Sequence, residues 1–113
     1  MARHVDFPVD SQFTDRWSPR GFDPNHTLNE GEIGSLFEAA RFAPSRANEQ
    51  PWIFYREKDK SSRELFLSFL TGGNAYWVKQ ASLVVIVCAR TRFSDDNTIN
   101  DHARFDTGAA GLV

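Results

Sequence analysis

Two arginines and a serine near the N-terminus, Arg16, Ser18 and Arg20, have the donors and the spacing to hold an anion. A guanidinium group is a planar fork of donors that fits phosphate or carboxylate, and a serine hydroxyl adds a further donor. Pro19 and Pro24 argue against a helix here, so a turn could aim the three side chains at one point. Arginines in loops are more often solvated, and both interpretations stay open.

A second polar segment, Ala43–Trp52, reads A-P-S-R-A-N-E-Q-P-W and lies between a helical pattern and a strand pattern. Pro44 is expected to end the helix before it, and Pro51 to precede the strand after it. Between the prolines the loop offers a hydroxyl, a guanidinium and an amide group, those of Ser45, Arg46 and Asn48. A polar loop is usually only a connection, so this composition alone predicts no particular ligand.

The helix that leads into this loop is predicted to start at Thr27 and to end near Phe42. Thr27 and Glu30 have the spacing of a capping box, with Thr27 as the N-cap. Apolar residues then recur at i, i+3, i+4 and i+7, which indicates one buried helical face: Ile33, Leu36, Phe37 and Ala40.

The residues after the loop predict two strands and further helices. A β-prone run at Trp52–Tyr55 and an unbroken apolar run at Leu83–Ala89 predict strands, the second buried on both faces. A second capping box at Ser61–Glu64 predicts a helix stopped by Gly72-Gly73. Its apolar stripe is Leu65, Phe66, Phe69 and Leu70. A short helical piece at Ala75–Gln80 and a helix over Ile99–Val113 complete the pattern.

The composition is that of one small globular domain. The chain has 113 residues, 41% of them hydrophobic and 25% charged, with a net charge of −2. No long basic run is present, so nothing favours nucleic acid. The longest apolar run, Leu83–Ala89, is too short for a membrane span, and Cys88 is the only cysteine. These features predict a soluble, cytoplasmic protein.

No metal site is predicted. His4, His26 and His102 lack the spacing of metal ligands, and the single cysteine offers them no thiolate pair. The acidic residues of the C-terminal part are predicted to be charges on loop and helix surfaces: Asp95, Asp96, Asp101 and Asp106.

Four segments, in this order, resemble the FMN-dependent nitroreductase family. The first is Arg16-x-Ser18-x-Arg20, and the second and most specific is the loop Ala43–Trp52 with its A-P-S-x-x-N-x-Q-P-W pattern. The third is Gly73-Asn74-x-x-Trp77, and the fourth is Asp106-x-Gly108-Ala109-Ala110. Together they extend over nearly the whole chain from Arg16 to Val113.

The resemblance implies an α+β fold, with a central, mostly antiparallel sheet flanked by helices, in an intimate homodimer with FMN at the interface. It implies that Arg16, Ser18 and Arg20 hold the FMN phosphate, ribityl chain and pyrimidine edge. Asn74 would contact a polar edge of the flavin. The loop residues that would cover the flavin of the partner subunit are Pro44, Ser45, Arg46 and Asn48. Gln50 and Trp52 are expected to anchor this loop.

The resemblance also implies the chemistry. Hydride from NAD(P)H would pass through the flavin to a nitroaromatic, a quinone or a similar small acceptor in a ping-pong cycle, so no catalytic side chain is predicted. Arg20 would stabilise the reduced, anionic flavin. Two alternatives stay open: another flavin reaction on the same fold, such as reductive dehalogenation or flavin fragmentation, and a non-catalytic interaction module without flavin.

The ends of the chain complete the prediction of domains. Residues 1–15 show no strong periodicity and are expected to be an N-terminal arm, with a helical turn after Ser11. Residues 16–113 are expected to be the N-terminal portion of the FMN-binding domain, since the chain stops inside the last predicted helix. We therefore expect these residues alone to bind FMN poorly and to be inactive.

Overall fold

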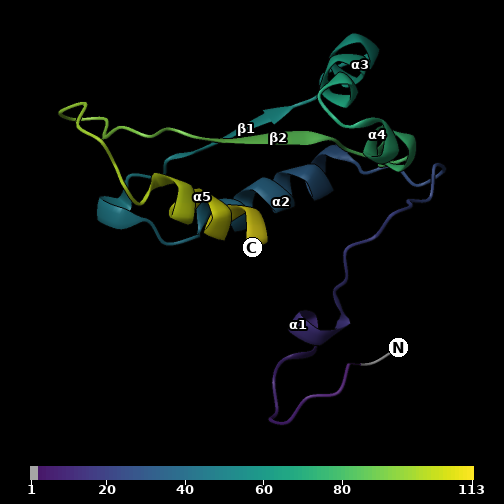
Figure 1. Cartoon of the computed structure of the whole chain (residues 1–113), viewed down its shortest axis with the longest axis horizontal. Coiled ribbons are helices and arrows are strands. Elements are labelled where there is room, and N and C mark those ends of the chain that lie inside the picture. The colour runs from purple at the N-terminus through teal and green to yellow at the C-terminus, as the bar shows by residue number, and fades with distance from the viewer. Residues whose placement is uncertain (1–2) are drawn as a thin grey trace.

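A computed structural model describes residues 3–113, which form a two-stranded sheet with helices beside it and at one end (Figure 1). The chain order is α1 (Ser11–Asp15), α2 (Glu30–Arg41), the short 3-10 helix η1 (Arg46–Asn48), β1 (Trp52–Arg56), α3 (Lys60–Ser68), α4 (Gly72–Val78), β2 (Val85–Ala89) and α5 (Ala103–Leu112). The strands pair antiparallel, with Trp52 opposite Ala89 and Arg56 opposite Val85. The mixture of helices with an antiparallel sheet confirms the predicted α+β class.

Helix α2 delivers the chain to the polar loop as predicted, but it starts later than predicted. Its N-cap is Asn29, not Thr27: the Asn29 side chain accepts from the Glu32 N–H at 2.9 Å, and the Glu32 carboxylate accepts from the Asn29 N–H at 2.8 Å. The local sequence fits a capping box at either Thr27 or Asn29. The residues before Asn29 lie against the segment before β2 instead of joining the helix, because the hydroxyl of Ser82 donates to the carbonyl of His26. The predicted end near Phe42 is confirmed, with Phe42 as the C-cap.

Helices α3 and α4 also differ from the prediction at their ends. Asp59, not Ser61, caps α3, in a reciprocal pair with Ser62. Because α3 already ends at Ser68, the pair Gly72-Gly73 does not stop it and instead forms the first turn of α4.

The two remaining elements are shorter than predicted. Strand β2 starts at Val85, two residues later than predicted. Its residue Val87 is 46% exposed within residues 3–113, so the prediction that this strand is buried on both faces is wrong. Helix α5 starts at Ala103 because Ile99 forms a bridge with Arg92 instead of joining the helix. These segments show that β-branched and apolar runs locate the elements but not their ends.

The core is small and consists largely of alanine. Ala40 and Ala43, at the end of α2, are buried against Ala110 of α5, and Trp52 and Phe54 of β1 pack on this cluster. Helix α5 contacts α2 and both strands, so it lies where the loop after α2 begins. Small side chains allow the backbones of α2 and α5 to approach closely.

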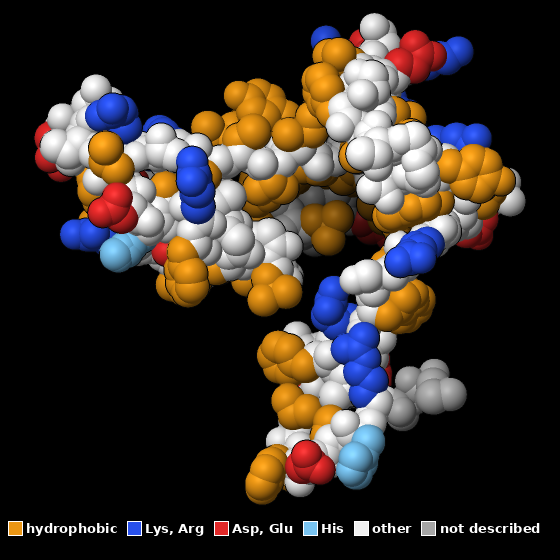
Figure 2. All heavy atoms as spheres, in the orientation of Figure 1, with side chains coloured by type: hydrophobic (Ala, Val, Ile, Leu, Met, Phe, Trp, Pro, Cys, Tyr) orange, Lys and Arg blue, Asp and Glu red, His pale blue; other side chains and the backbone are white. Residues whose placement is uncertain are grey.

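The chain exposes much more surface than a compact protein of its size. Its accessible surface is 8810 Å², whereas about 6,300 Å² is expected for a folded monomer of this mass. The radius of gyration is 16.6 Å, against about 13 Å for a compact domain. The N-terminal segment with α1 stands away from the body in Figure 1, and Figure 2 shows hydrophobic side chains over this segment and across the middle of the body.

The corrected N-cap can be tested by comparing Asn29→Ala with Thr27→Ala. Removing Asn29 leaves an N–H of the first turn of α2 without its acceptor, so we expect a loss of about 1 kcal/mol in the free energy of unfolding. Thr27→Ala should change it by less than about 0.5 kcal/mol. Urea unfolding of both variants measures the difference. A larger loss of unfolding free energy in Thr27→Ala than in Asn29→Ala would indicate that Thr27 is the cap.

Candidate functional site

The loop after α2 has an unusual backbone. Ala47, Asn48 and Gln50 have φ angles of 53°, 52° and 49°. This left-handed region is sparsely populated by residues other than glycine, and asparagine tolerates it better than alanine or glutamine. Each such residue costs on the order of 1 kcal/mol, so contacts outside these residues must hold the loop in shape.

Hydrogen bonds inside the loop join its polar side chains. The Gln50 N–H donates to the Ser45 hydroxyl oxygen at 3.0 Å, and the Gln50 side-chain amide donates to the side-chain oxygen Oδ1 of Asn48 at 3.0 Å. These bonds use acceptor oxygens of Ser45 and Asn48. The hydroxyl proton of Ser45 and the NH₂ group of Asn48 therefore remain available to donate to a ligand.

Two carboxylates connect the loop to the rest of the chain. Asp106 of α5 is only 7% exposed, and its Oδ2 accepts from the Arg46 N–H at 3.0 Å. At the other side, Glu49 Oε1 accepts from the Ser94 N–H at 2.6 Å and from the Arg90 guanidinium at 3.1 Å. Hydrogen bonding from Ser94, with the positive charge of Arg90, lowers the pKa of Glu49 below its ordinary value.

The loop thus presents donors to its surroundings. The exposed guanidinium of Arg46 lies 5.6 Å from the centre of the Phe93 ring and is a further donor beside Ser45 and Asn48. Pro44 is exposed at the start of the loop. A set of donors with a positive charge suits a ligand rich in carbonyl and phosphate oxygens.

The N-terminal segment presents a second set of donors. Arg16, Ser18 and Arg20 are exposed, and within residues 3–113 their side chains have no hydrogen-bond partner in the chain. Phe22 packs against Trp77 of α4, with ring centroids 5.8 Å apart, and joins this segment to the helix that carries the exposed Asn74. Trp77 therefore packs on the N-terminal segment.

The two sets of donors do not meet within one chain. In Figure 1 the loop that follows α2 lies at the left end of the molecule, α4 lies at the right end, and the segment after α1 lies below the body. The structure therefore brings Ser45, Arg46 and Asn48 together, and brings the segment after α1 towards α4, but separates these groups from one another.

Asp106 and Glu49 were missed as functional candidates. The prediction that Asp106 is a surface charge is wrong, because it occupies the buried face of α5 together with Ala103, Thr107 and Ala110. Their spacing of i, i+3, i+4 and i+7 was a usable signal, since a carboxylate on an apolar stripe requires a donor. Nothing in the local sequence around Glu49 identifies its partners, which lie more than forty residues away.

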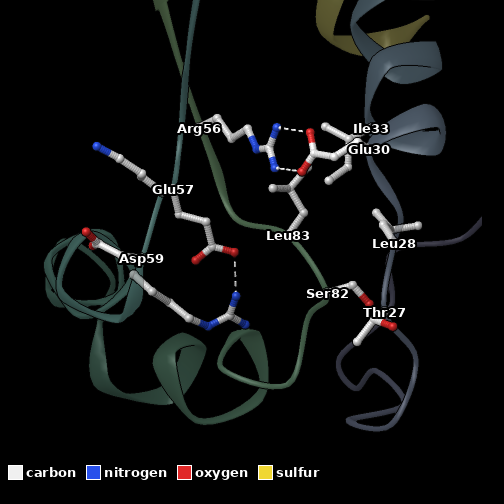
Figure 3. A pocket seen from close by; sticks show the side chains of 11 residues that line it. Thr27, Leu28, Glu30, Ile33, Arg56, Glu57, Asp59, Ser82 and Leu83 are labelled. Atoms are coloured by element: carbon white, nitrogen blue, oxygen red, sulfur yellow. Dashed lines mark hydrogen bonds and ion pairs between the residues drawn. The ribbon is translucent and has the colours of Figure 1, made fainter.

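A pocket of about 300 Å³ lies elsewhere, between the start of α2, the end of β1 and the residues before β2 (Figure 3). Its charged side chains pair with one another. Arg56 forms a double hydrogen bond with Glu30, and Arg63 pairs with Glu57 at 2.5 Å. The hydrogen bonds from Arg56 lower the pKa of Glu30. This pocket contains none of the predicted site residues, and its ion pairs connect α2 with β1 and the residue after β1 with α3.

Within residues 3–113, no group of three or more histidine, cysteine, aspartate or glutamate side chains is arranged to hold a metal ion. None of the helices described is both long and apolar enough to span a bilayer.

Comparison with known proteins identifies the family. The model of the nitroreductase family matches residues 13–83, which include the N-terminal donors, the loop after α2 and α4. The chain belongs to the nitroreductase family. It is 31% identical over 75 residues to an oxygen-insensitive NADPH nitroreductase of Helicobacter pylori, an alignment that covers 66% of this chain and 35% of that protein. It is 29% identical over 83 residues to an oxygen-insensitive NAD(P)H nitroreductase of Salmonella typhimurium, covering 71% and 38%.

The fold agrees with this assignment. The chain is similar to the crystal structure of an oxidoreductase containing FMN, with a TM-score of 0.89 and 37% identity over 97% of this chain and 57% of that one. The fold is therefore nitroreductase-like, as predicted. The chain spans little more than a third of the length of the two nitroreductases that it matches.

The lowered pKa of Glu49 predicts how pH affects the loop anchor. A carboxylate whose pKa is lower in the folded state contributes stability above its unfolded pKa, about 4.3, and loses this contribution as the pH falls through the folded pKa. We expect the difference in unfolding free energy between wild type and Glu49→Gln to shrink as the pH is lowered from 6 to about 3.

Urea unfolding across this pH range measures the effect. The matched control is Glu64→Gln, which changes an exposed carboxylate 3.9 Å from Lys60 on α3. A wild-type advantage over Glu49→Gln that stays constant down to pH 3 would contradict the assigned role of the Glu49 charge.

Proposed function

We propose that the full-length protein is an FMN-dependent oxidoreductase that uses NAD(P)H to reduce a small acceptor such as a nitroaromatic or a quinone. The observation that carries the proposal is the loop after α2, whose fixed backbone leaves the donors of Ser45, Arg46 and Asn48 free. The nitroreductase names of the matched relatives and the FMN in the similar solved structure support it.

The available side chains fit the chemistry of FMN. FMN carries a phosphate, a hydroxylated ribityl chain and ring carbonyls, all of which accept hydrogen bonds. Arg16, Ser18 and Arg20 form a cationic donor set that suits the phosphate and the ribityl chain. We assign Asn74 to a polar edge of the flavin. The loop residues Pro44, Ser45, Arg46 and Asn48 would cover the ring.

The separation of the two donor sets favours a site shared by two subunits. A single chain keeps the loop after α2 apart from the segment after α1, so one ligand can use both sets only if they come from different copies. We therefore propose a homodimer with FMN at the interface.

In this proposal the protein binds and orients, and the bound FMN supplies the capacity to accept and donate electrons. Arg20 would lie beside the pyrimidine edge, where its positive charge favours added negative charge on the ring. The loop would exclude water from one face. The use of NAD(P)H and the free thiol of Cys88 are in keeping with a cytoplasmic location.

The absorbance spectrum of the purified full-length protein tests the proposal. We expect a flavin band that bleaches anaerobically on addition of NADPH or NADH and returns on addition of a quinone or a nitroaromatic. A bound flavin that bleaches with neither nicotinamide would contradict the proposed reaction and favour another flavin reaction on this fold. A colourless protein that takes up no FMN would favour a flavin-free interaction module.

The role of Asn48 can be separated from its backbone conformation. Asn48→Ala removes the amide and also places alanine at a φ of 52°, whereas Asn48→Gly removes the amide and adopts this φ without cost. We expect both variants to bind FMN on the order of tenfold more weakly, through the loss of at least one hydrogen bond, and to remain dimeric.

Equilibrium dialysis measures FMN affinity, and size-exclusion chromatography checks the dimer. Wild-type affinity in Asn48→Gly would mean that the amide does not contact the flavin.

A further inference from the structure

The loop after α2 depends on one contact that comes from far along the chain. The Arg46 N–H donates to Asp106 Oδ2 at 3.0 Å, and Asp106 lies 60 residues later, in the first turn of α5. Asp106 as a residue is only 7% exposed, so packing holds it as well as the hydrogen bond. Its own N–H donates to the carbonyl of His102, which fixes it within the helix.

This contact lies immediately before the left-handed residues. The bond is at residue 46, and the positive φ angles begin at Ala47. The hydrogen bonds of Gln50 within the loop cannot replace it, because they join residues 45, 48 and 50 to one another and not to the body of the protein. Asp106 thus sets where the strained segment starts relative to α5.

The same helix face holds the core. Ala110 follows Asp106 by four residues and packs against Ala40 and Ala43, the end of α2. The loop is therefore held against α5 by an apolar contact before Pro44 and by a carboxylate after it. The second anchor, Glu49 with Arg90 and Ser94, holds its far side.

We propose that Asp106 is a positioning residue for cofactor binding: it touches neither flavin nor substrate, but holds the loop so that Ser45, Arg46 and Asn48 present their donors in one arrangement. This inference rests on the proposed FMN site. The loop requires a hydrogen-bond acceptor from residue 106 at the position of Oδ2. The negative charge of the carboxylate is not required.

The test compares substitutions of Asp106 in the full-length protein. Asp106→Ala leaves the Arg46 N–H without its acceptor, and we expect FMN to bind about tenfold or more weakly, with an altered visible circular dichroism of the bound flavin. Asp106→Asn retains a carbonyl oxygen in the same place and should stay within about threefold of wild type, with the wild-type dichroism. Asp101→Ala, at an exposed position just before α5, is the matched control and should change neither.

The outcomes separate this inference from the proposed function. A wild type that takes up no FMN would overturn the proposed function, and the inference with it. Tight FMN binding by the wild type and by Asp106→Ala alike would overturn the inference alone. An equal loss in Asp106→Ala and Asp106→Asn would also overturn it, since the charge would then be what matters.

A further variant, Asp106→Glu, tests the inference if Asp106→Ala does not fold. Asp106→Glu keeps the charge but moves the carboxylate outward by one methylene group. We expect it to bind FMN severalfold more weakly than Asp106→Asn, although both fold. Equal affinity in these two variants would overturn the inference.

Discussion

The backbone is left-handed at Ala47, Asn48 and Gln50. Because this conformation is unfavourable for such residues, contacts with other parts of the chain must stabilise it. Those contacts are two carboxylates with partners distant in sequence, Asp106 on one side and Glu49 on the other. The neighbouring elements position this loop. Helix α2 and Pro44 bring the chain to the loop, Pro51 and β1 lead it away, and α5 lies against both.

Helix α5 links the stability of the chain to its proposed function. One stripe of this helix carries Ala110, which packs into the core, and Asp106, which accepts from the loop. Displacing α5 would therefore alter the core and the loop together. A buried carboxylate is costly unless it is hydrogen-bonded, so α5 and the loop stabilise each other.

The proposed homodimer would connect two features of this chain, its exposed apolar surface and its separated donor sets. A core made mostly of alanine side chains buries little apolar area, and the N-terminal segment has few contacts with the body in the chain described. In a homodimer that shares its ligand sites, the same association would cover apolar surface and bring the donors of two chains together. Stability and ligand binding would then depend on one interface.

Much of the fold could be predicted from local pattern. The apolar period of residues 33–40 located α2, the β-branched and aromatic runs located both strands, and the two prolines delimited the loop. The ends were less predictable where two caps compete. Thr27 and Asn29 both have the sequence pattern of a capping box, but only Asn29 forms one. The contact of Ser82 with His26, more than fifty residues apart, favours the later start.

The sequence by itself determined the family and the chemical groups of the loop, because residue types and their order are local and specific. The tertiary structure alone decided which of these groups are free to donate and what holds them. Ser45 and Asn48 have their acceptor oxygens occupied by Gln50, and Asp106 is buried although it was predicted to be a surface charge. The physical reason is that burial and hydrogen-bond partners depend on segments up to 60 residues apart, which no local period records.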